Sequence, residues 1–261
     1  QVVFSDSALK MIDFQKTRVL ITGAGGGVGR SLTAAFASAG ALVVACDLPD
    51  VDLSESHIKE RHYFDLRQRN DIEEHAQAIL SGGVPQIVVS NAGWTREENL
   101  ATTTGSGILD EMDINFTGPA LLAHALLPAM RTFSGDKAFV FVASCNALSH
   151  FGNPAYSAAK AATLAWMRAI AVEEAPNGIR ANAVAPASIR TEAWDHRLKK
   201  DPKVLDRLKA IYPMGRLVST QEVANAVLFL ASSTASGITG ITMNVDAGLT
   251  AGNLPFLEAI K

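Results

Sequence analysis

Residues 18–29 decide the fold of this chain: Arg-Val-Leu-Ile-Thr-Gly-Ala-Gly-Gly-Gly-Val-Gly. The apolar run 18–22 shows no alternation of apolar and polar positions, which is typical of a strand buried on both faces. The stretch 28–39 that follows has apolar residues at helical spacing, and Gly40 ends it. A buried strand, a glycine-rich turn and an amphipathic helix in this order predict the first unit of a parallel α/β sheet.

The same alternation of apolar strands and helical stretches continues along the chain. Further strands are predicted at 41–46, 62–64, 86–89, 138–143, 179–184 and 241–245. Further helices are predicted at 71–80, 109–130 (with Pro119 near its middle), 154–175 and 220–231. The charged segment 187–213 interrupts the alternation and is expected to form one or two surface helices. We therefore expect one domain over 12–250, a doubly wound parallel sheet with helices on both faces. It would be flanked by an N-terminal extension at 1–11, natural or added, and a C-terminal tail at 251–261.

Composition excludes several classes of protein. The chain has 261 residues, 48% of them hydrophobic, and a formal net charge of −3, so it can bury a sizeable core but lacks the basic surface of a nucleic-acid-binding protein. Its longest apolar runs are too short to span a membrane, and no signal peptide is recognisable. The two cysteines, Cys46 and Cys145, fit a reducing compartment, and we expect a cytoplasmic protein. The histidines show no metal-ligand spacing, so no catalytic metal is predicted.

The glycine-rich turn predicts a phosphate site. Thr22–Gly29 follows the pattern Thr-Gly-x-x-x-Gly-x-Gly rather than the strict Gly-x-Gly-x-x-Gly. Glycines let the backbone approach a pyrophosphate closely, and the helix N-terminus offers free N–H groups and a positive dipole end. The alternative is a glycine-rich turn that binds nothing, against which the position between a strand and a helix argues.

Asp47 ends the second predicted strand about 20 residues beyond the turn. A carboxylate there can accept hydrogen bonds from both ribose hydroxyls of an adenosine and would repel a 2′-phosphate. Because no Arg or Lys follows closely, the sequence favours NAD over NADP. Asp47 could instead be an ordinary turn residue.

Tyr156 and Lys160 are four residues apart in a predicted helix, which places them on one face. A phenol has an unperturbed pKa of about 10, and a neighbouring ammonium lowers that pKa by stabilising the phenolate. The pair could therefore exchange a proton with an alcohol or carbonyl oxygen. Taken alone it could equally be a packed Tyr beside a solvated Lys.

Further motifs accompany the turn and the Tyr-x-x-x-Lys pair in a set order. They are Asp65-Leu66, Asn91-Ala92-Gly93, Asn115 within 113–118, Ser144 after 141–143, the stretch 179–186 ending at Pro186, Thr191, and the closing segments 238–240 and 245–248. Together they resemble the short-chain dehydrogenase/reductase family over 12–250, nearly the whole chain. The resemblance implies a Rossmann-type fold and an NAD(H)-dependent oxidoreductase acting on CH–OH groups.

The resemblance also assigns roles. Tyr156 would exchange the proton, Lys160 would lower its pKa and hold the nicotinamide ribose, Ser144 would orient the substrate oxygen, and Asn115 would hold a water linking Lys160 to solvent. Cofactor contacts are implied at Gly23, Gly27, Val28, Gly29, Asp47, Asp65, Leu66, Asn91, Ala92, Gly93, Tyr156, Lys160, Pro186, Ile189 and Thr191. The implied assembly is a homotetramer with helices 109–130 and 154–175 at one interface.

The chain departs from the family pattern at Ser90, where a second Asn is common, and at Ala187, where Gly is usual. Ser144 and Tyr156 are also one residue closer than expected, which makes the pocket shape harder to predict. Substrate contacts are expected at Trp94, Asn146, His150 and Trp194.

The polar residues before Tyr156 favour a small polar substrate such as a sugar, polyol or hydroxy acid. A 3-oxoacyl thioester reductase with the same catalytic group is the alternative. A non-catalytic dinucleotide-binding sensor is a third reading, but it would have no need of the four catalytic side chains.

Overall fold

A computed structural model describes residues 12–96, 98–190, 201 and 203–261. Its sheet has seven parallel strands in the order β3-β2-β1-β4-β5-β6-β7. Their bounds are β1 Arg18–Thr22, β2 Leu42–Asp47, β3 Ile58–Tyr63, β4 Ile87–Ser90, β5 Lys137–Val142, β6 Ile179–Pro186 and β7 Thr242–Val245. The strand order reverses between β1 and β4, and the crevice at such a switch point is where doubly wound sheets bind ligands.

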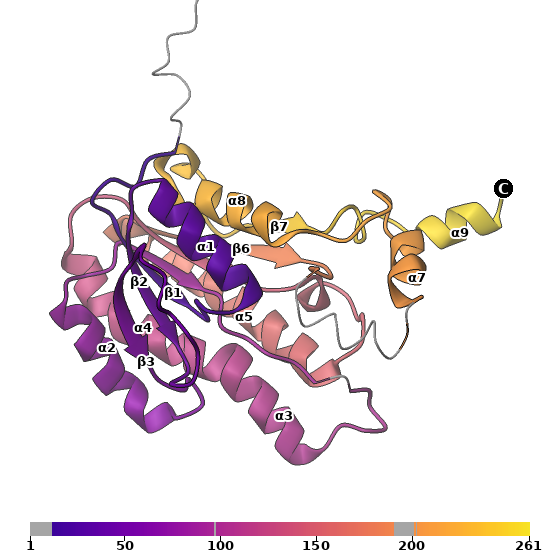
Figure 1. Ribbon diagram of the computed structural model, residues 1–261, viewed down its shortest axis with the longest axis horizontal. Coiled ribbons are helices and arrows are strands. Elements are labelled where there is room, and N and C mark those ends of the chain that lie inside the picture. Colours follow the sequence, from indigo (N-terminus) through magenta and orange to yellow (C-terminus); the bar gives the residue numbers. More distant parts are fainter. Residues whose placement is uncertain (1–11, 97, 191–200, 202) are drawn as a thin grey trace, which may run out of the picture.

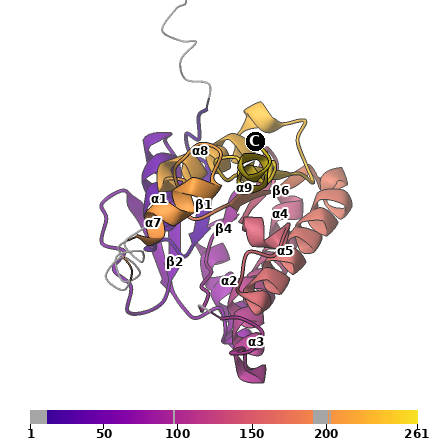
Figure 2. The ribbon, with the colours of Figure 1, turned by 90° about the vertical axis from the view of Figure 1, so that its right-hand side faces the viewer.

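Helices cover both faces of the sheet (Figures 1 and 2). One face carries α1 (Gly27–Ser38) and α8 (Thr220–Ala231), which pack against each other. The other carries α2 (Ile72–Ser81), α4 (Gly118–Thr132) and α5 (Pro154–Glu173). The doubly wound sheet predicted from the sequence is confirmed.

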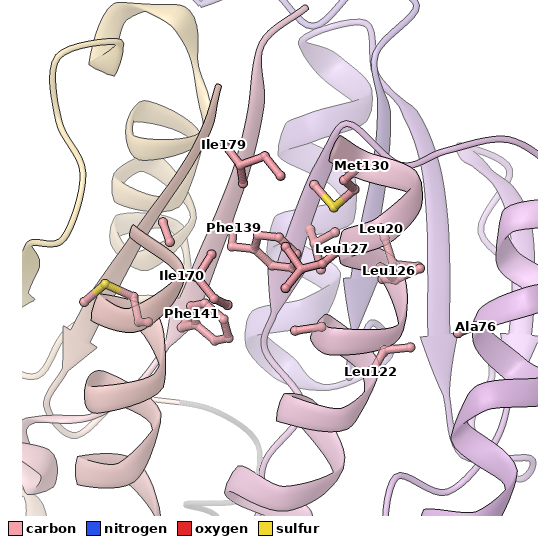
Figure 3. Packing of buried hydrophobic residues seen from close by; sticks show 14 of the residues in the cluster. Leu20, Ala76, Leu122, Leu126, Leu127, Met130, Phe139, Phe141, Ile170 and Ile179 are labelled. Atoms are coloured by element: carbon pink, nitrogen blue, oxygen red, sulfur yellow. The ribbon is translucent and has the colours of Figure 1, made fainter. Parts of the chain in front are cut away.

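The core on the second face explains why the central strands β1, β4 and β5 are mostly apolar (Figure 3). Phe139 and Phe141 of β5 point to this face, where they meet Leu126 of α4 and Ile170 of α5. The alternate residues of β5, such as Val140, belong to the cluster under α1 and α8. Because both faces of β5 are buried, its residues are apolar except the first, Lys137, whose ammonium donates to the carbonyl of Phe133 at 2.6 Å.

The predicted helix 109–130 differs from what the structure contains. The helical stretch begins earlier, as α3 (Gly105–Met112), and passes through one π-helical segment at Asp113–Thr117 before α4. Pro119 lies in the first turn of α4, where it provides no N–H to the helical stretch before it. The long helix predicted over 109–130 is present, but it begins four residues earlier and contains a π-helical segment that no residue spacing indicates.

The weakly predicted strand 62–64 is longer, spanning β3, and it forms an edge of the sheet. Its polar sequence, Ile-Lys-Glu-Arg-His-Tyr, fits an edge strand with one face toward solvent.

Of the predicted surface helices in 187–213, α7 is described at Val204–Ile211, and 191–200 lies outside the described residues. The expected tail contains a short helix, α9 (Leu254–Ala259), which extends from the body beside α7 (Figure 1). Within the described ranges, the helices are all too short or too polar to cross a membrane.

Candidate active site

One cleft of about 1170 Å³ opens at the carboxyl ends of the parallel strands. It brings together the glycine-rich turn, the ends of β2, β4, β5 and β6, and the first half of α5. The predicted residues that line it are Gly23, Gly27, Val28, Gly29, Asp47, Asp65, Leu66, Asn91, Ala92, Gly93, Trp94, Ser144, Asn146, Tyr156, Lys160, Pro186 and Ile189. Thr191 and Trp194 lie outside the described residues.

The glycine-rich turn is packed so tightly that side chains would not fit. Gly23 has φ +63, and a Cβ there would lie 2.8 Å from the Cα of Ala92. A Cβ on Gly29 would lie 2.0 Å from the carbonyl oxygen of Gly23. Asn91 holds the turn from β4 by donating through Nδ2 to the carbonyls of Thr22 and Gly23, at 3.0 Å each. Helix α1 starts from this turn with no described side chain capping its first N–H groups, which suits the pyrophosphate of a dinucleotide.

Asp47 closes the other side of the turn. Its Oδ2 accepts the backbone N–H of Gly25 at 2.8 Å, and its Oδ1 accepts that of Leu48 at 2.8 Å. The carboxylate is therefore fixed at the edge of the cleft with lone pairs left for ribose hydroxyls.

Arg67 is a cleft residue that sequence reasoning missed, because a basic residue was sought only just after Asp47. Its Nε lies 3.0 Å from both carboxylate oxygens of Asp65, and its Nη2 lies 2.6 Å from Oδ2. This bidentate pair holds the pKa of Asp65 below its usual range.

Tyr156 and Lys160 lie side by side on α5. The Nζ of Lys160 is 5.6 Å from the centre of the Tyr156 ring and donates to the carbonyl of Val142 at 3.0 Å. Ser144, just beyond β5, lies beside the Tyr156 phenol and acts to lower its pKa. The three side chains thus converge from β5 and α5 on one point of the cleft.

Burial controls the titration of this pair. Burial raises the pKa of Tyr156 to about 12, with Ser144 acting against the rise and the charges of Cys145 and Glu111 adding to it. Burial also lowers the pKa of Lys160 to about 8. The expected lowering of the tyrosine pKa by its lysine neighbour is therefore wrong for the cofactor-free protein. The tyrosine is protonated there at neutral pH, because burial disfavours the charged phenolate.

Asn115 is buried in the π-helical segment behind the cleft. Its Nδ2 donates to the carbonyl of Trp94 at 2.7 Å, and its Oδ1 accepts the N–H of Trp94 at 3.1 Å. Pro119 lacks the N–H that an α-helix would direct to the carbonyl of Asn115. That carbonyl accepts the hydroxyl of Thr163, three residues beyond Lys160, at 3.1 Å.

The polar side chains expected to contact substrate are mostly hydrogen-bonded within the protein or lie outside the cleft. Asn146 donates through Nδ2 to the carbonyl of Gly152 at 2.8 Å and to the hydroxyl of Ser157 at 3.2 Å. His150 is exposed and does not line the cleft. Trp94 lines the rim, 50% exposed, with the Arg96 guanidinium 5.1 Å from its ring centre.

Apolar side chains from distant parts of the chain line much of the cleft. Those that sequence reasoning missed include Phe151, Leu208, Ile211, Tyr212 and Leu249. The Tyr212 hydroxyl accepts the N–H of Ser188 at 3.0 Å and so connects the end of α7 to the segment after β6. No sequence signal marked these residues, because they come together only through folding.

The described residues contain no group of three or more His, Cys, Asp or Glu side chains able to hold a metal ion. Cys46 and Cys145 are buried free thiols. The chemistry available in the cleft is thus that of a partly buried Tyr156, a buried Lys160 and the Ser144 hydroxyl beside the glycine-rich turn.

These features define a Rossmann-type oxidoreductase, and the comparisons with known proteins agree. A family model described as enoyl-(acyl carrier protein) reductase matches residues 23–250. The chain belongs to the short-chain dehydrogenase/reductase family of oxidoreductases. It is 36% identical to an uncharacterized oxidoreductase of Schizosaccharomyces pombe, over 93% of this chain and 94% of that protein.

Relatives of stated activity differ in their substrates. A galactitol 2-dehydrogenase of Rhizobium johnstonii is 33% identical, over 89% of this chain and 95% of that protein. A (3R)-3-hydroxyacyl-CoA dehydrogenase of Rattus norvegicus is 30% identical, over 88% and 95%. Among solved structures, a short-chain dehydrogenase/reductase of Burkholderia thailandensis superposes with a TM-score of 0.86 at 33% identity, covering 94% of this chain and 97% of that one. An ElxO variant with NADPH bound superposes with a TM-score of 0.83 at 27% identity, covering 91% and 100%.

Proposed function

We propose that this protein is an NAD(H)-dependent dehydrogenase/reductase that interconverts an alcohol and its carbonyl compound, with Tyr156, Lys160, Ser144 and Asn115 as its catalytic group. The observation that carries the proposal is the convergence of Tyr156, Lys160 and Ser144 in the cleft that also contains the glycine-rich turn. A protein that only sensed a dinucleotide would need the turn but not this convergence.

The cleft fits a nicotinamide dinucleotide. Gly23, Gly29 and the uncapped start of α1 would hold the pyrophosphate, and Asp47 would hold the adenosine ribose. The fixed Asp47 carboxylate supports NAD, because a 2′-phosphate would meet its negative charge. Arg67 is paired with Asp65 and offers that phosphate little compensation. When bound, the nicotinamide ring supplies the hydride acceptor or donor.

The chain's own residues handle the proton. In carbonyl reduction Tyr156, protonated at neutral pH, donates its phenolic proton to the substrate oxygen while Ser144 hydrogen-bonds that oxygen. In alcohol oxidation the tyrosine must first lose its proton, and the Lys160 ammonium stabilises the phenolate. Asn115 keeps the segment after β4 against α5 and, through a water, would connect Lys160 with solvent.

The substrate end of the cleft favours a molecule with apolar surface. Phe151, Ile211 and Leu249 line the cleft, and the Asn146 amide is engaged by the protein itself. These contacts support a secondary alcohol or ketone with an apolar substituent more than the sugar or polyol expected from the sequence. A 3-hydroxyacyl or 3-oxoacyl thioester is the second candidate, because its acyl chain would meet the same side chains.

We further propose a homotetramer built on the outer faces of α3–α4 and α5. Leu109, Leu121 and Val172 are exposed on these helices, and apolar side chains on two neighbouring faces suit a subunit interface. The two free thiols fit a reducing compartment such as the cytoplasm. We expect the protein to bind a small-molecule substrate and to have neither nucleic acid nor membrane as a partner.

The testing experiment is a spectrophotometric screen of NAD and NADP reduction with secondary alcohols, 3-hydroxyacyl thioesters, polyols, sugars and hydroxy acids. We expect turnover with NAD and an apolar secondary alcohol or hydroxyacyl thioester. Turnover of polyols alone would overturn the substrate proposal. Dinucleotide binding without turnover of any compound would favour the sensor.

A further inference from the structure

Glu111 is a buried carboxylate that the reaction outlined above does not use. It lies on α3, one helical turn before Asn115, and is 2% exposed. A carboxylate buried to this degree is costly unless donors surround it. Its retention in the interior beside the catalytic group calls for a physical role.

Two amide donors converge on this carboxylate. Its Oε1 accepts the backbone N–H of Arg96 at 2.7 Å, and its Oε2 accepts Nδ2 of Asn115 at 2.9 Å. Burial raises the pKa of Glu111, and the Arg96 N–H acts against that rise. A protonated acid would direct its own O–H at one of these donors, so the pair favours the anion. Glu111 thereby fixes both the segment after Gly93 and the Asn115 amide.

The Asn115 amide and the Lys160 ammonium flank the same glycine. A Cβ built on Gly93 would lie 2.8 Å from Oδ1 of Asn115 and 3.1 Å from Nζ of Lys160. The hydrogen-bond acceptor of Lys160 is the uncharged carbonyl of Val142. Glu111 binds the Asn115 amide at 2.9 Å, and its negative charge acts on the Lys160 ammonium beyond that amide.

The other charged groups facing Glu111 do not replace it. Arg96 and Glu98 precede α3, Asp110 is on α3, and Tyr156 and Lys160 come from α5. Arg96 is held at the surface by Asp110 at 2.8 Å, with Glu98 at 3.9 Å. Its charge is thus balanced by these two carboxylates at the rim of the cleft.

We propose that Glu111 is a positioning residue that orients Asn115 and supplies the negative charge that keeps the buried Lys160 ammonium charged at working pH. This inference rests on the proposed function, because it gives Lys160 a role in the reaction. Its consequence is that the pH range of activity depends on a carboxylate that never contacts substrate.

The test compares Glu111→Gln with the wild-type protein. In the cofactor-free protein, trace acetylation with acetic anhydride over a pH series, read by peptide mass spectrometry, reports the fraction of neutral Lys160. Because a negative charge raises the pKa of a nearby ammonium, its removal should lower the Lys160 pKa by about 0.5 to 1, less than a directly contacting charge would produce. The acid limb of kcat/KM for alcohol oxidation should move to lower pH as well, since Glu111 also raises the Tyr156 pKa.

Asp113→Asn is the matched control. It removes a carboxylate two residues further along the same helical stretch, where Asp113 pairs with Arg69 at 2.7 Å. It should leave both the Lys160 pKa and the pH profile of kcat/KM for alcohol oxidation unchanged. A Glu111→Gln protein that loses kcat but keeps both titrations unchanged would overturn the proposal and leave Glu111 as a structural residue.

Should Glu111→Gln fail to fold, Lys160→Met tests the same coupling from the other side. Charge coupling is reciprocal, so loss of the ammonium must raise the Glu111 pKa, which carbon-13 NMR of the carboxyl follows. An unmoved Glu111 titration would overturn the proposal. Both titrations are made without substrate, so a failure of the proposed function, seen as full turnover in Tyr156→Phe, is distinguishable from a failure of this inference.

Discussion

The ammonium of Lys160 on α5 donates a 3.0 Å hydrogen bond to the carbonyl of Val142, the last residue of β5. This bond attaches the helix that carries Tyr156 to the edge of the sheet from which Ser144 follows. The positions of Tyr156 and Lys160 relative to the end of β5 are thereby fixed by two rigid elements.

Tyr156→Phe should reduce turnover by at least about a hundredfold, because it removes the oxygen that exchanges the proton and keeps the ring and its packing. Dinucleotide binding, followed by fluorescence titration, should persist. Tyr63→Phe is the control, since Tyr63 is exposed on the edge strand β3. Near-normal turnover in Tyr156→Phe would show that another group transfers the proton.

Alcohol oxidation should rise with pH and carbonyl reduction should fall with pH. Burial raises the pKa of Tyr156 to about 12 in the cofactor-free protein, so the proton donor is present and the base is scarce at neutral pH. With saturating NAD, the positive nicotinamide charge and Lys160 should bring the apparent pKa for oxidation well below the free phenol value of about 10. Initial rates in both directions between pH 6 and 10 test this. Oxidation that does not change with pH over this range would contradict the assignment.

Gly93→Ala should reduce kcat by about a hundredfold, the effect of a misplacement of about 1 Å. The added Cβ would meet the Asn115 amide at 2.8 Å and the Lys160 ammonium at 3.1 Å, so both must move. Gly105→Ala is the matched control, because nothing lies within 4 Å of its Cβ position at the start of α3. Equal activity of the two variants would argue against a role for the Asn115–Lys160 arrangement.

Asp47→Ser should weaken NAD binding and reduce discrimination against NADP, because it removes the negative charge at the ribose site. The measurement is the ratio of kcat/KM with the two cofactors. Asp50→Ser removes an exposed carboxylate three residues on and should leave this ratio unchanged. A wild-type protein that prefers NADP would refute this part of the proposal.

Lys160→Met should reduce activity. The stability of this variant relative to the wild type should be highest at neutral pH. Burial lowers the folded-state pKa of Lys160 from 10.5 to about 8, so between these values the unfolded chain binds more protons and the free energy of unfolding of the wild type rises with pH. The variant lacks this rise, which is at most about 3 kcal/mol. Its stability relative to wild type should therefore decrease from pH 7 to pH 10, as urea unfolding at each pH would show. A constant difference would mean that Lys160 titrates normally.

Much of the fold could be predicted because it is expressed in local periodicity. Apolar runs without alternation marked the strands buried on both faces, and helical spacing marked α1, α2, α5 and α8 within one or two residues. The edge strand β3 was underestimated, since its polar, half-exposed sequence resembles a loop. The π-helical segment around Asn115 was missed, because no residue spacing requires it.

By itself, the sequence determined the strand–turn–helix unit at 18–39, the identity of the cofactor turn and the Tyr156–Lys160 pair, since each depends on residues close along the chain. The tertiary structure decided what surrounds them. It paired Arg67 with Asp65, turned His150 to solvent, occupied the Asn146 amide and buried Glu111 beside Asn115. In the cofactor-free protein it also raised the pKa of Tyr156, whereas the sequence predicted a lowered pKa. The physical reason is that desolvation depends on every atom packed around a group, and those atoms come from elements far apart in the sequence.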